Sequence, residues 1–428
     1  MHVYFSGLGG VAIGPLALIA QDLGYEVSGS DIQRSRLTDI VKERGVDVKI
    51  GQDGSQIAAA HTQSPIDWIV VTSSLPESHP ELAFAKKHNI KLTKRDELIN
   101  HILKEQDLKL VAISGTHGKT TTTAMITWLF KQLNEPVSYS IGTVVPFGPY
   151  GQFQKGSHYF IYECDEYDHN FLAFHPHLGV ITTIDYDHPD TYPTKESYQA
   201  AFGQFASQCG QLVVWEDDLS KLDNHHLKPV VLTYADVPDR KQLPLVGEHV
   251  RQNAYQAMRA YQMLAGAKKA DESELLAILG KYPGTDRRLE VLARSPAGGA
   301  IYTTYAHHPK EIKVDLQAVR EVADEVIVVY QPHQNTRQHA IAKEYRDAFD
   351  QAAHVYWLPT YITREQEDLP ILSPAELIKN LADSNKAEPA EMNDALIQKI
   401  KEDLNRGAHV IFMGAGPIDD WARQNFKI

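Results

Sequence analysis

A glycine-rich segment at residues 114–121, Ser-Gly-Thr-His-Gly-Lys-Thr-Thr, carries residue types that bind the phosphates of a nucleotide. An apolar run precedes it and a helical pattern follows, so backbone N–H groups and a helix N-terminus would face the phosphates. Lys119 would point at the ligand and reach the β- and γ-phosphates, and Thr120 would place its hydroxyl on Mg²⁺. The general pattern has a glycine where this chain has Ile113, so the segment predicts a shorter, variant P-loop.

A second glycine loop, Gly7-Leu8-Gly9-Gly10-Val11-Ala12, follows a short apolar run at the N-terminus. It fits the dinucleotide-binding fingerprint, and Asp31 ends the next predicted strand, where an acid that binds a ribose would lie. The fingerprint reports a diphosphate on a helix N-terminus. Because NAD, FAD and a UDP-sugar all carry that group, the loop alone leaves an oxidoreductase and a nucleotide-sugar enzyme open.

Acidic residues follow two predicted strands of the segment that contains the P-loop. The first set is Glu163, Asp165, Glu166 and Asp168, and the second is Asp185, Asp187, His188 and Asp190. Ligands bind beyond the carboxyl ends of such strands, and Mg²⁺ takes one or two protein carboxylates beside phosphate oxygens. Glu163 is the best candidate because it comes first after its apolar run, and His188 would bind a second metal or orient a phosphate.

Histidines follow two predicted strands near the C-terminus. Tyr305-Ala306-His307-His308-Pro309 comes after one strand, and Gln331-Pro332-His333, with Arg337 shortly after, comes after the next. Both segments would lie at the carboxyl edge of one sheet, where they could line a common face.

Short β-branched runs alternate with helical patterns along the chain, which predicts α/β layers with mostly parallel sheets. Helical spacing is clear at residues 13–23 and 247–266. We expect three domains, at residues 1–105, 106–284 and 285–428: a Rossmann-like domain, a P-loop α/β domain and a second Rossmann-like domain. The predicted strands are 3–6, 26–30, 67–72, 90–93, 108–114, 159–163, 179–184, 211–215, 300–304, 325–330, 354–358 and 409–413.

Composition narrows the class of protein. A chain of 428 residues is too long for one core, and a formal charge of −13 argues against nucleic acid or an anionic membrane as the main partner. Only two cysteines, Cys164 and Cys209, are present, which is typical of a reducing compartment. The N-terminus lacks the pattern of a signal peptide. We therefore expect a cytoplasmic protein with small-molecule substrates, either a monomer or a homodimer.

Taken together and in order, these motifs resemble those of the Mur ligases, and the resemblance covers nearly the whole chain. The segments that carry it are GLGGVAIGPLA (7–17), GSD (29–31), TSSLPESHPE (72–81), GTHGKTTTT (115–123), ECDEYD (163–168), IDYDHPDTY (184–192), GEHVRQNA (247–254), GTDRRLE (284–290), YAHHP (305–309), QPHQNTR (331–337) and MGAGPI (413–418).

The resemblance implies a role for each domain. The first would bind the UDP part of the substrate, the second ATP and Mg²⁺, and the third the incoming amino acid. UDP-sugar positions are Gly7, Gly9, Gly10, Ser30, Asp31, Thr72, Ser73 and Ser74. ATP positions are Gly115, Thr116, His117, Gly118, Lys119, Thr120, Thr121, His249, Asn253 and Arg288, metal positions are Thr120, Glu163 and His188, and acceptor positions are His308, His333 and Arg337.

The reaction implied is the ATP-dependent addition of L-alanine to the carboxylate of UDP-N-acetylmuramate. The carboxylate would attack the γ-phosphate of ATP, and the amine would then attack the resulting acyl phosphate. Lys119, Mg²⁺ and Arg288 would neutralise the charge on the transferring group. His308 and His333 are both candidates for the base that takes the proton of the amine, and His188 is a further catalytic candidate.

Two departures from the family pattern leave alternatives open. Thr303 and Thr304 stand where the family usually has two aspartates, the second of which contacts the ribose of ATP. The resemblance therefore implies that this contact is weakened or replaced, and a fold that binds nucleotide without turnover remains an alternative. Another alternative is a ligase for a recycled murein tripeptide, suggested by Gly247 to His249 and by Asn335-Thr336. A third is an oxidoreductase using nicotinamide, which rests on Gly7 to Ala12 and Asp31.

Overall fold

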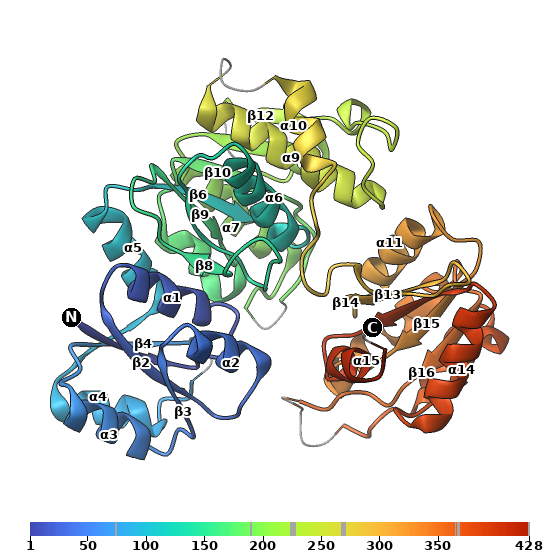
Figure 1. Ribbon diagram of the computed structural model, residues 1–428, viewed down its shortest axis with the longest axis horizontal. Helices are drawn as coiled ribbons and strands as arrows, with labels where there is room; N and C mark the ends of the chain where they lie inside the picture. Colours follow the sequence, from blue (N-terminus) through green and yellow to red (C-terminus); the bar gives the residue numbers. More distant parts are fainter. Residues whose placement is uncertain are drawn as a thin grey trace. The chain divides into compact units, whose positions relative to one another are not determined.

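A computed structural model describes residues 1–72, 75–188, 191–222, 228–266, 271–363, 365 and 369–426. Three mainly parallel sheets with helices packed on them organise these residues, which confirms the three-domain α/β architecture (Figure 1). By their contacts the residues form two compact units, 1–243 with 252–283, and 244–251 with 284–428. The first unit contains two of the sheets and the second contains the third. No helix among the described residues is both long and apolar enough to cross a membrane.

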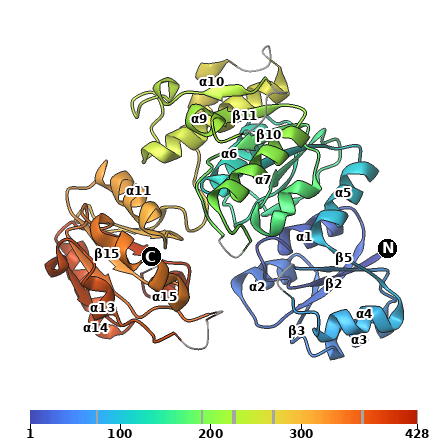
Figure 2. The ribbon, with the colours of Figure 1, turned by 180° about the vertical axis from the view of Figure 1, so that it is seen from behind.

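The first sheet has the strand order β3-β2-β1-β4-β5, with all neighbours parallel. Buried side chains place α1 and α5 on one face and α3 and α4 on the other (Figures 1 and 2). Strand order reverses at β1, so ligands are expected beyond the carboxyl ends of β1 and β4. The elements are β1 (His2–Ser6), α1 (Gly14–Asp22), β2 (Glu26–Asp31), α2 (Arg36–Glu43), β3 (Asp47–Ile50), α3 (Ser55–Gln63), β4 (Trp68–Val71), α4 (Pro80–His88), β5 (Lys91–Lys94) and α5 (Arg95–Glu105).

The second sheet has the order β12-β11-β10-β6-β9-β7-β8, and only the β7–β8 pair is antiparallel among its described strands. Central β6 is buried along almost its whole length, as its apolar sequence predicts. The elements are β6 (Lys109–Ser114), α6 (Lys119–Gln132), β7 (Ser138–Ser140), β8 (Gly151–Gln152), β9 (Tyr159–Glu163), η1 (Tyr167–Ala173), β10 (Leu178–Ile181), α7 (Lys195–Gln208), β11 (Leu212–Trp215), α8 (Glu216–Leu219), β12 (Val230–Leu232), η2 (Tyr234–Asp236), α9 (Glu248–Ala265) and α10 (Glu272–Leu279).

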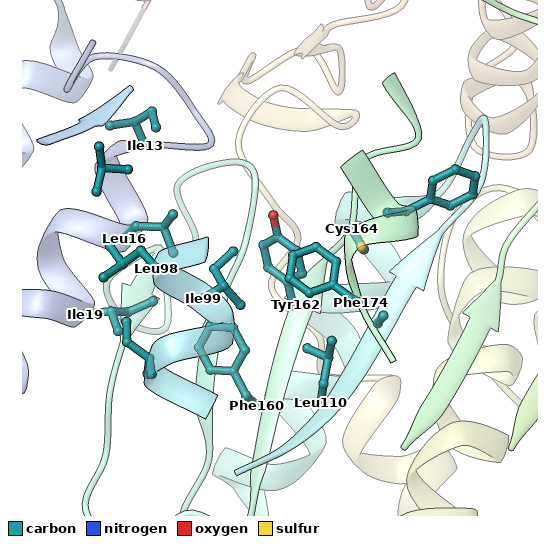
Figure 3. Close-up of a cluster of buried hydrophobic side chains, with 14 of the residues drawn as sticks. Ile13, Leu16, Ile19, Leu98, Ile99, Leu110, Phe160, Tyr162, Cys164 and Phe174 are labelled. Atoms are coloured by element: carbon teal, nitrogen blue, oxygen red, sulfur yellow. The ribbon is translucent and has the colours of Figure 1, made fainter. Parts of the chain in front are cut away.

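One hydrophobic core joins these two sheets. Side chains of α1 and α5 pack in a single buried cluster with side chains of β6 and β9 (Figure 3). Each fully buried aliphatic side chain of this kind contributes about 1.5–3 kcal/mol. The members labelled in Figure 3 are Ile13, Leu16, Ile19, Leu98, Ile99, Leu110, Phe160, Tyr162, Cys164 and Phe174. The shared core explains why the first two sheets form one compact unit, and the boundary at residue 105 stays a prediction.

The third sheet has the order β13-β14-β18-β15-β16-β17, parallel except for the β13–β14 pair. Helix α11 packs on one face, and α14 and α15 pack on the other. The elements are β13 (Glu290–Arg294), β14 (Ala300–Thr304), α11 (Pro309–Arg320), β15 (Val326–Tyr330), α12 (Asn335–Ile341), η3 (Ala342–Asp347), β16 (His354–Trp357), α13 (Pro374–Ile378), η4 (Ser384–Lys386), β17 (Ala387–Pro389), α14 (Asp394–Asn405), β18 (His409–Met413) and α15 (Ile418–Phe426).

Candidate active site

The P-loop connects β6 to α6 and needs glycine at two positions. Gly115 has φ +136° and Gly118 has φ +84°, values that L side chains rarely adopt. A Cβ atom on Gly118 would also lie 2.6 Å from the Oδ1 atom of Asn253, which α9 brings against the loop. The structure thus places Asn253, predicted from sequence to bind ATP, beside the P-loop.

The other P-loop positions are tied to the end of β10. Thr116 Oγ1 donates to the carbonyl oxygen of Asp185 over 2.6 Å, and the backbone N–H of His117 donates to Thr183 Oγ1 over 2.9 Å. Thr121 follows in the first turn of α6 and is half-buried. Because β6 and β10 are parallel neighbours, their carboxyl ends hold this loop in place.

A hydroxyl and a carboxylate, both predicted from sequence to bind Mg²⁺, meet at the start of α6. The hydroxyl of Thr120 donates to the carboxylate of Glu163 over 2.7 Å, and the backbone N–H of Gly142 donates to the other carboxylate oxygen over 2.7 Å. Glu163 reaches this place because β9 pairs with β6 in parallel. No group of three or more His, Cys, Asp or Glu side chains among the described residues could hold a metal ion. Mg²⁺ that takes its other ligands from phosphate and water needs only a pair such as this one.

Lys119 is held by a buried carboxylate that the sequence analysis did not select. Its Nζ atom lies 2.9 Å from Glu166 Oε2, and Glu166 is only 1% exposed. Burial alone would raise the pKa of Glu166, but the charge of Lys119 and the contact with His188 lower that pKa to about 2. An ionised glutamate therefore fixes the P-loop lysine at neutral pH.

His188 also lies against Glu166, with its Nε2 atom 3.6 Å from Oε1. Burial lowers the pKa of His188, but the contact with Glu166 and the charge of Asp187 outweigh burial and raise that pKa above the ordinary value. The structure thus brings His188 to Lys119 through Glu166. Three acids, Asp165, Glu166 and Asp168, follow β9 closely in the sequence, and no local pattern marks which of them is buried.

The N-terminal glycine loop brings its predicted residues together. The N–H groups of Gly7 and Gly9 donate to the Ser30 carbonyl oxygen and to Asp31 Oδ2, over 2.9 and 2.7 Å. A Cβ on Gly7 would lie 3.5 Å from the Thr72 methyl group. Gly10 closes the turn by donating to the Gly7 carbonyl oxygen. The predicted Ser73 and Ser74 lie outside the described residues.

A buried carboxylate under this loop was also missed from sequence. Glu81, at the start of α4, is fully buried and accepts hydrogen bonds from the hydroxyls of Tyr4, Ser6 and Ser30. The bond from Ser30 is 2.6 Å long. Ser30 therefore anchors the loop through Glu81 in this structure, so its predicted contact with a UDP-sugar would compete with that bond.

In the second unit, Thr303 and Thr304 each contact a carboxylate from a helix. Thr303 Oγ1 donates to Asp419 of α15 over 2.7 Å, and Thr304 Oγ1 donates to Asp315 of α11 over 2.6 Å. Asp315 also lies 3.7 Å from the Nε2 atom of His249. Burial raises the pKa of Asp315 to about 7 and lowers the pKa of His249 to about 4. Sequence reasoning identified His249 but not Asp315.

The predicted acceptor residues lie at the carboxyl ends of β14 and β15. The ring of His333 lies 5.7 Å from that of His307, whose pKa is lowered by burial. His308 instead begins α11 as its N-cap residue, with its Nε2 atom 3.8 Å from Glu344. The charge of Arg337 is close enough to lower the pKa of His307 further. A neutral His307 beside His333 is therefore a third candidate for the base.

Comparison with known proteins assigns all three parts of the chain to one family. Residues 2–107 match the family model described as Mur ligase family, catalytic domain. Residues 113–241 match the Mur ligase middle domain, and residues 287–416 match the Mur ligase, glutamate ligase domain.

Relatives that match along most of the chain support the same family. The UDP-N-acetylmuramate–L-alanine ligase of Caldicellulosiruptor bescii is 30% identical, over 97% of this chain and 96% of the relative. The enzyme of that name from Roseiflexus sp. is 32% identical over 86% of each chain. The crystal structure of the UDP-N-acetylmuramate–alanine ligase from Thermotoga maritima has the same fold, with a TM-score of 0.80, 22% identity and coverage of 99% and 98% of the two chains. From the three domain matches and these relatives, the chain belongs to the Mur ligase family.

Proposed function

We propose that this chain is an ATP-dependent ligase that joins L-alanine to the carboxylate of UDP-N-acetylmuramate. The observation that carries this proposal is the P-loop, where Lys119 and the Thr120–Glu163 pair meet at the carboxyl edge of the second sheet. The relatives named above support the choice of substrates. The P-loop has no role in a nicotinamide-dependent oxidoreductase, so only the loop at Gly7 supports that alternative.

The residues of the chain suit an acyl-phosphate reaction. A substrate carboxylate oxygen attacks the γ-phosphorus, and the bond to ADP breaks; Lys119 and Arg288 stabilise the charge on the transferring group. The amine then attacks the acyl carbon, phosphate leaves, and the amine proton passes to a base. A neutral imidazole can accept that proton, and His307, His308 and His333 are the candidates. The loop at Gly7 to Gly10 binds the diphosphate of the UDP-sugar.

Mg²⁺ fits the donor set at the start of α6, because the Thr120 hydroxyl and the Glu163 carboxylate are the hard oxygen ligands that it prefers. When bound, it neutralises phosphate charge. We further propose a cytosolic location, which the reducing-type cysteine usage supports, since Cys164 and Cys209 are both free and buried.

An acceptor screen tests the proposed function. With ATP and UDP-N-acetylmuramate, we expect phosphate release with L-alanine and slower release with glycine or L-serine. A methyl or hydroxyl difference in a small pocket is worth only about 1–3 kcal/mol, so discrimination will be incomplete. A murein tripeptide that outperforms L-alanine would identify the recycling ligase instead, and no release with any acceptor would overturn the ligase assignment.

Arg337→Ala in the same assay should raise the KM for L-alanine on the order of tenfold or more and leave the KM for ATP nearly unchanged. The planar guanidinium would pair with the amino-acid carboxylate, a charge-assisted bond that Ala cannot make. The matched control is Arg346→Ala on η3, an exposed arginine that should change neither value. Equal KM increases for L-alanine and ATP would place Arg337 elsewhere.

A second prediction concerns magnesium. Glu163→Gln should raise the Mg²⁺ concentration for half-maximal activity by on the order of tenfold, because a neutral amide is a poorer ligand than a carboxylate. His188→Gln should raise it less. Asp168→Asn, which changes an exposed acid paired with Lys94, is the control and should have no effect. An unchanged magnesium titration for Glu163→Gln would remove Glu163 from the metal site.

A further inference from the structure

Asp315 is a buried carboxylate, and none of the described lysines or arginines lies within ion-pair distance of it. One oxygen accepts the hydroxyl of Thr304 over 2.6 Å, and the other has His249 as its nearest described partner, at 3.7 Å. That separation is too long for a hydrogen bond. Asp315 is only 8% exposed, so an ionised form there has little contact with water, and the nearby charge of Arg288 offsets the effect of burial only in part, since the pKa of Asp315 is still raised. The oxygen that faces His249 can therefore accept hydrogen bonds from neutral donors, such as hydroxyl groups.

The neighbours of Asp315 indicate what would supply those donors. Burial sets the direction of two pKa shifts, upward for Asp315 and downward for His249, and the nearby charge of Arg288 lowers both pKa values. A guanidinium suits a phosphate, a neutral imidazole suits the edge or face of a base, and a carboxylate suits hydroxyl groups. These three chemistries occur together in one ligand class, a nucleoside phosphate.

We propose that Asp315 is the carboxylate that binds the ribose hydroxyls of the nucleotide in this chain. Asp315 lies on helix α11, and the hydroxyl of Thr304, on strand β14, holds its side chain in place. The nucleotide site therefore keeps a carboxylate although residue 304 is a threonine. The inference rests on the proposed function, because it assumes that ATP binds beside Arg288.

The neighbouring threonine on β14, Thr303, also contacts an aspartate, Asp419 of α15, and this aspartate serves as a structural comparison. Asp419 also accepts a threonine hydroxyl, from Thr303, but it is paired with Arg423 at 3.0 Å and lies 3.9 Å from Arg287. Its charge is compensated within the protein. Asp315 has no such direct ion pair with a described lysine or arginine, which distinguishes a carboxylate left for a ligand from one that stabilises the fold.

Calorimetry with ATP, 2′-deoxy-ATP and 3′-deoxy-ATP, in the absence of the UDP-sugar, tests the proposal. Wild-type protein should bind ATP on the order of tenfold or more tightly than at least one deoxy analogue, the range expected for a charge-assisted hydrogen bond. In Asp315→Asn the affinity for ATP should fall by a similar factor, and the preference for ATP over that analogue should fall towards one.

Two further variants guard against a purely structural effect. Asp419→Asn, the same change in the neighbouring pair, should lower the melting temperature and keep the preference for the ribose hydroxyls. The double variant Thr304→Asp with Asp315→Thr swaps the two residues, so the carboxylate comes from strand β14 and the hydroxyl from α11. This variant should regain the wild-type preference for ATP over the deoxy analogue.

The outcomes separate this inference from the proposed function. Wild-type protein that binds no ATP would overturn both. Wild-type protein that binds ATP and both deoxy analogues equally well would overturn the role of Asp315 alone. So would an Asp315→Asn variant that is folded and retains the wild-type preference.

Discussion

Lys119→Met should lower turnover by on the order of a thousandfold, with a far smaller effect on the KM for L-alanine. The ammonium group stabilises charge that develops on the transferring phosphoryl group, and the loss of one such contact costs about 3–4 kcal/mol of transition-state stabilisation. The measurement is phosphate release at saturating substrates. Near-normal turnover would mean that the P-loop has been misread.

The same variant should also be less stable, which sequence reasoning did not predict. The motif suggests a side chain that points only at ligand, so its removal should leave the fold intact. The structure instead pairs Lys119 with Glu166 at 2.9 Å, and Glu166 is 1% exposed. Removing one member of a buried pair leaves the other charge uncompensated and costs about 3–5 kcal/mol. Denaturant unfolding would measure this loss.

A double variant separates the two effects. Lys119→Met with Glu166→Gln removes both charges, so much of the lost stability should return while turnover stays low. Replacing a buried pair by neutral groups of similar volume is often close to neutral for stability. If turnover recovered with stability, the loss in the single variant would reflect misfolding and not missing chemistry.

Most strands that were predicted from sequence lie inside a sheet, and edge strand β5 is the exception. β6, β9, β14 and β18 were expected within one residue of their observed ends, because strands buried on both faces read as continuous apolar runs. The strands β7 and β8 were not expected and are only three and two residues long. The other strands that were not expected, β3, β12, β13 and β17, are all edge strands. Most of their residues are exposed or half-buried, so no apolar run marks them.

The candidate site shows the same division. Residues inside a motif, such as Lys119 and Thr120, were identifiable because the loop defines its own geometry. Glu81, Asp315 and His307 were not, because their roles depend on contacts between elements or on burial. Glu81 meets Ser30 across 51 positions of sequence, and nothing local to α4 indicates that contact. A single sequence shows the type of an acid but not its burial.

Glu166→Gln should destabilise the protein by about 3–5 kcal/mol at neutral pH, because Lys119 then stays buried without its carboxylate. The lowered pKa of Glu166 determines how the stability of the wild-type protein changes with pH. Although burial opposes ionisation, Lys119 and His188 lower the pKa of Glu166 from 4.5 to about 2. The stability from the ionised form is therefore complete above pH 4.5, amounts to roughly 3 kcal/mol, and is lost as the pH falls toward 2.

Unfolding free energies measured between pH 5 and pH 2 should thus fall steeply for wild-type protein and less steeply for Glu166→Gln. Glu376→Gln is the matched control, since Glu376 also has a lowered pKa, through hydrogen bonds from Ser373, but is exposed. Its profile should stay close to that of the wild type. Equal stability of Glu166→Gln and wild-type protein at pH 7 would show that the buried pair does not form.

The same variant links the buried carboxylate to the charge of the active site. In the wild type, burial lowers the pKa of His188, but Glu166 and Asp187 outweigh it and raise that pKa above the ordinary value. Without the Glu166 carboxylate the pKa of His188 should fall, so the imidazole becomes neutral at a lower pH. An NMR titration of the His188 ring would follow this shift. An unshifted His188 would mean that Glu166 holds Lys119 alone and that the charge of the histidine is set elsewhere.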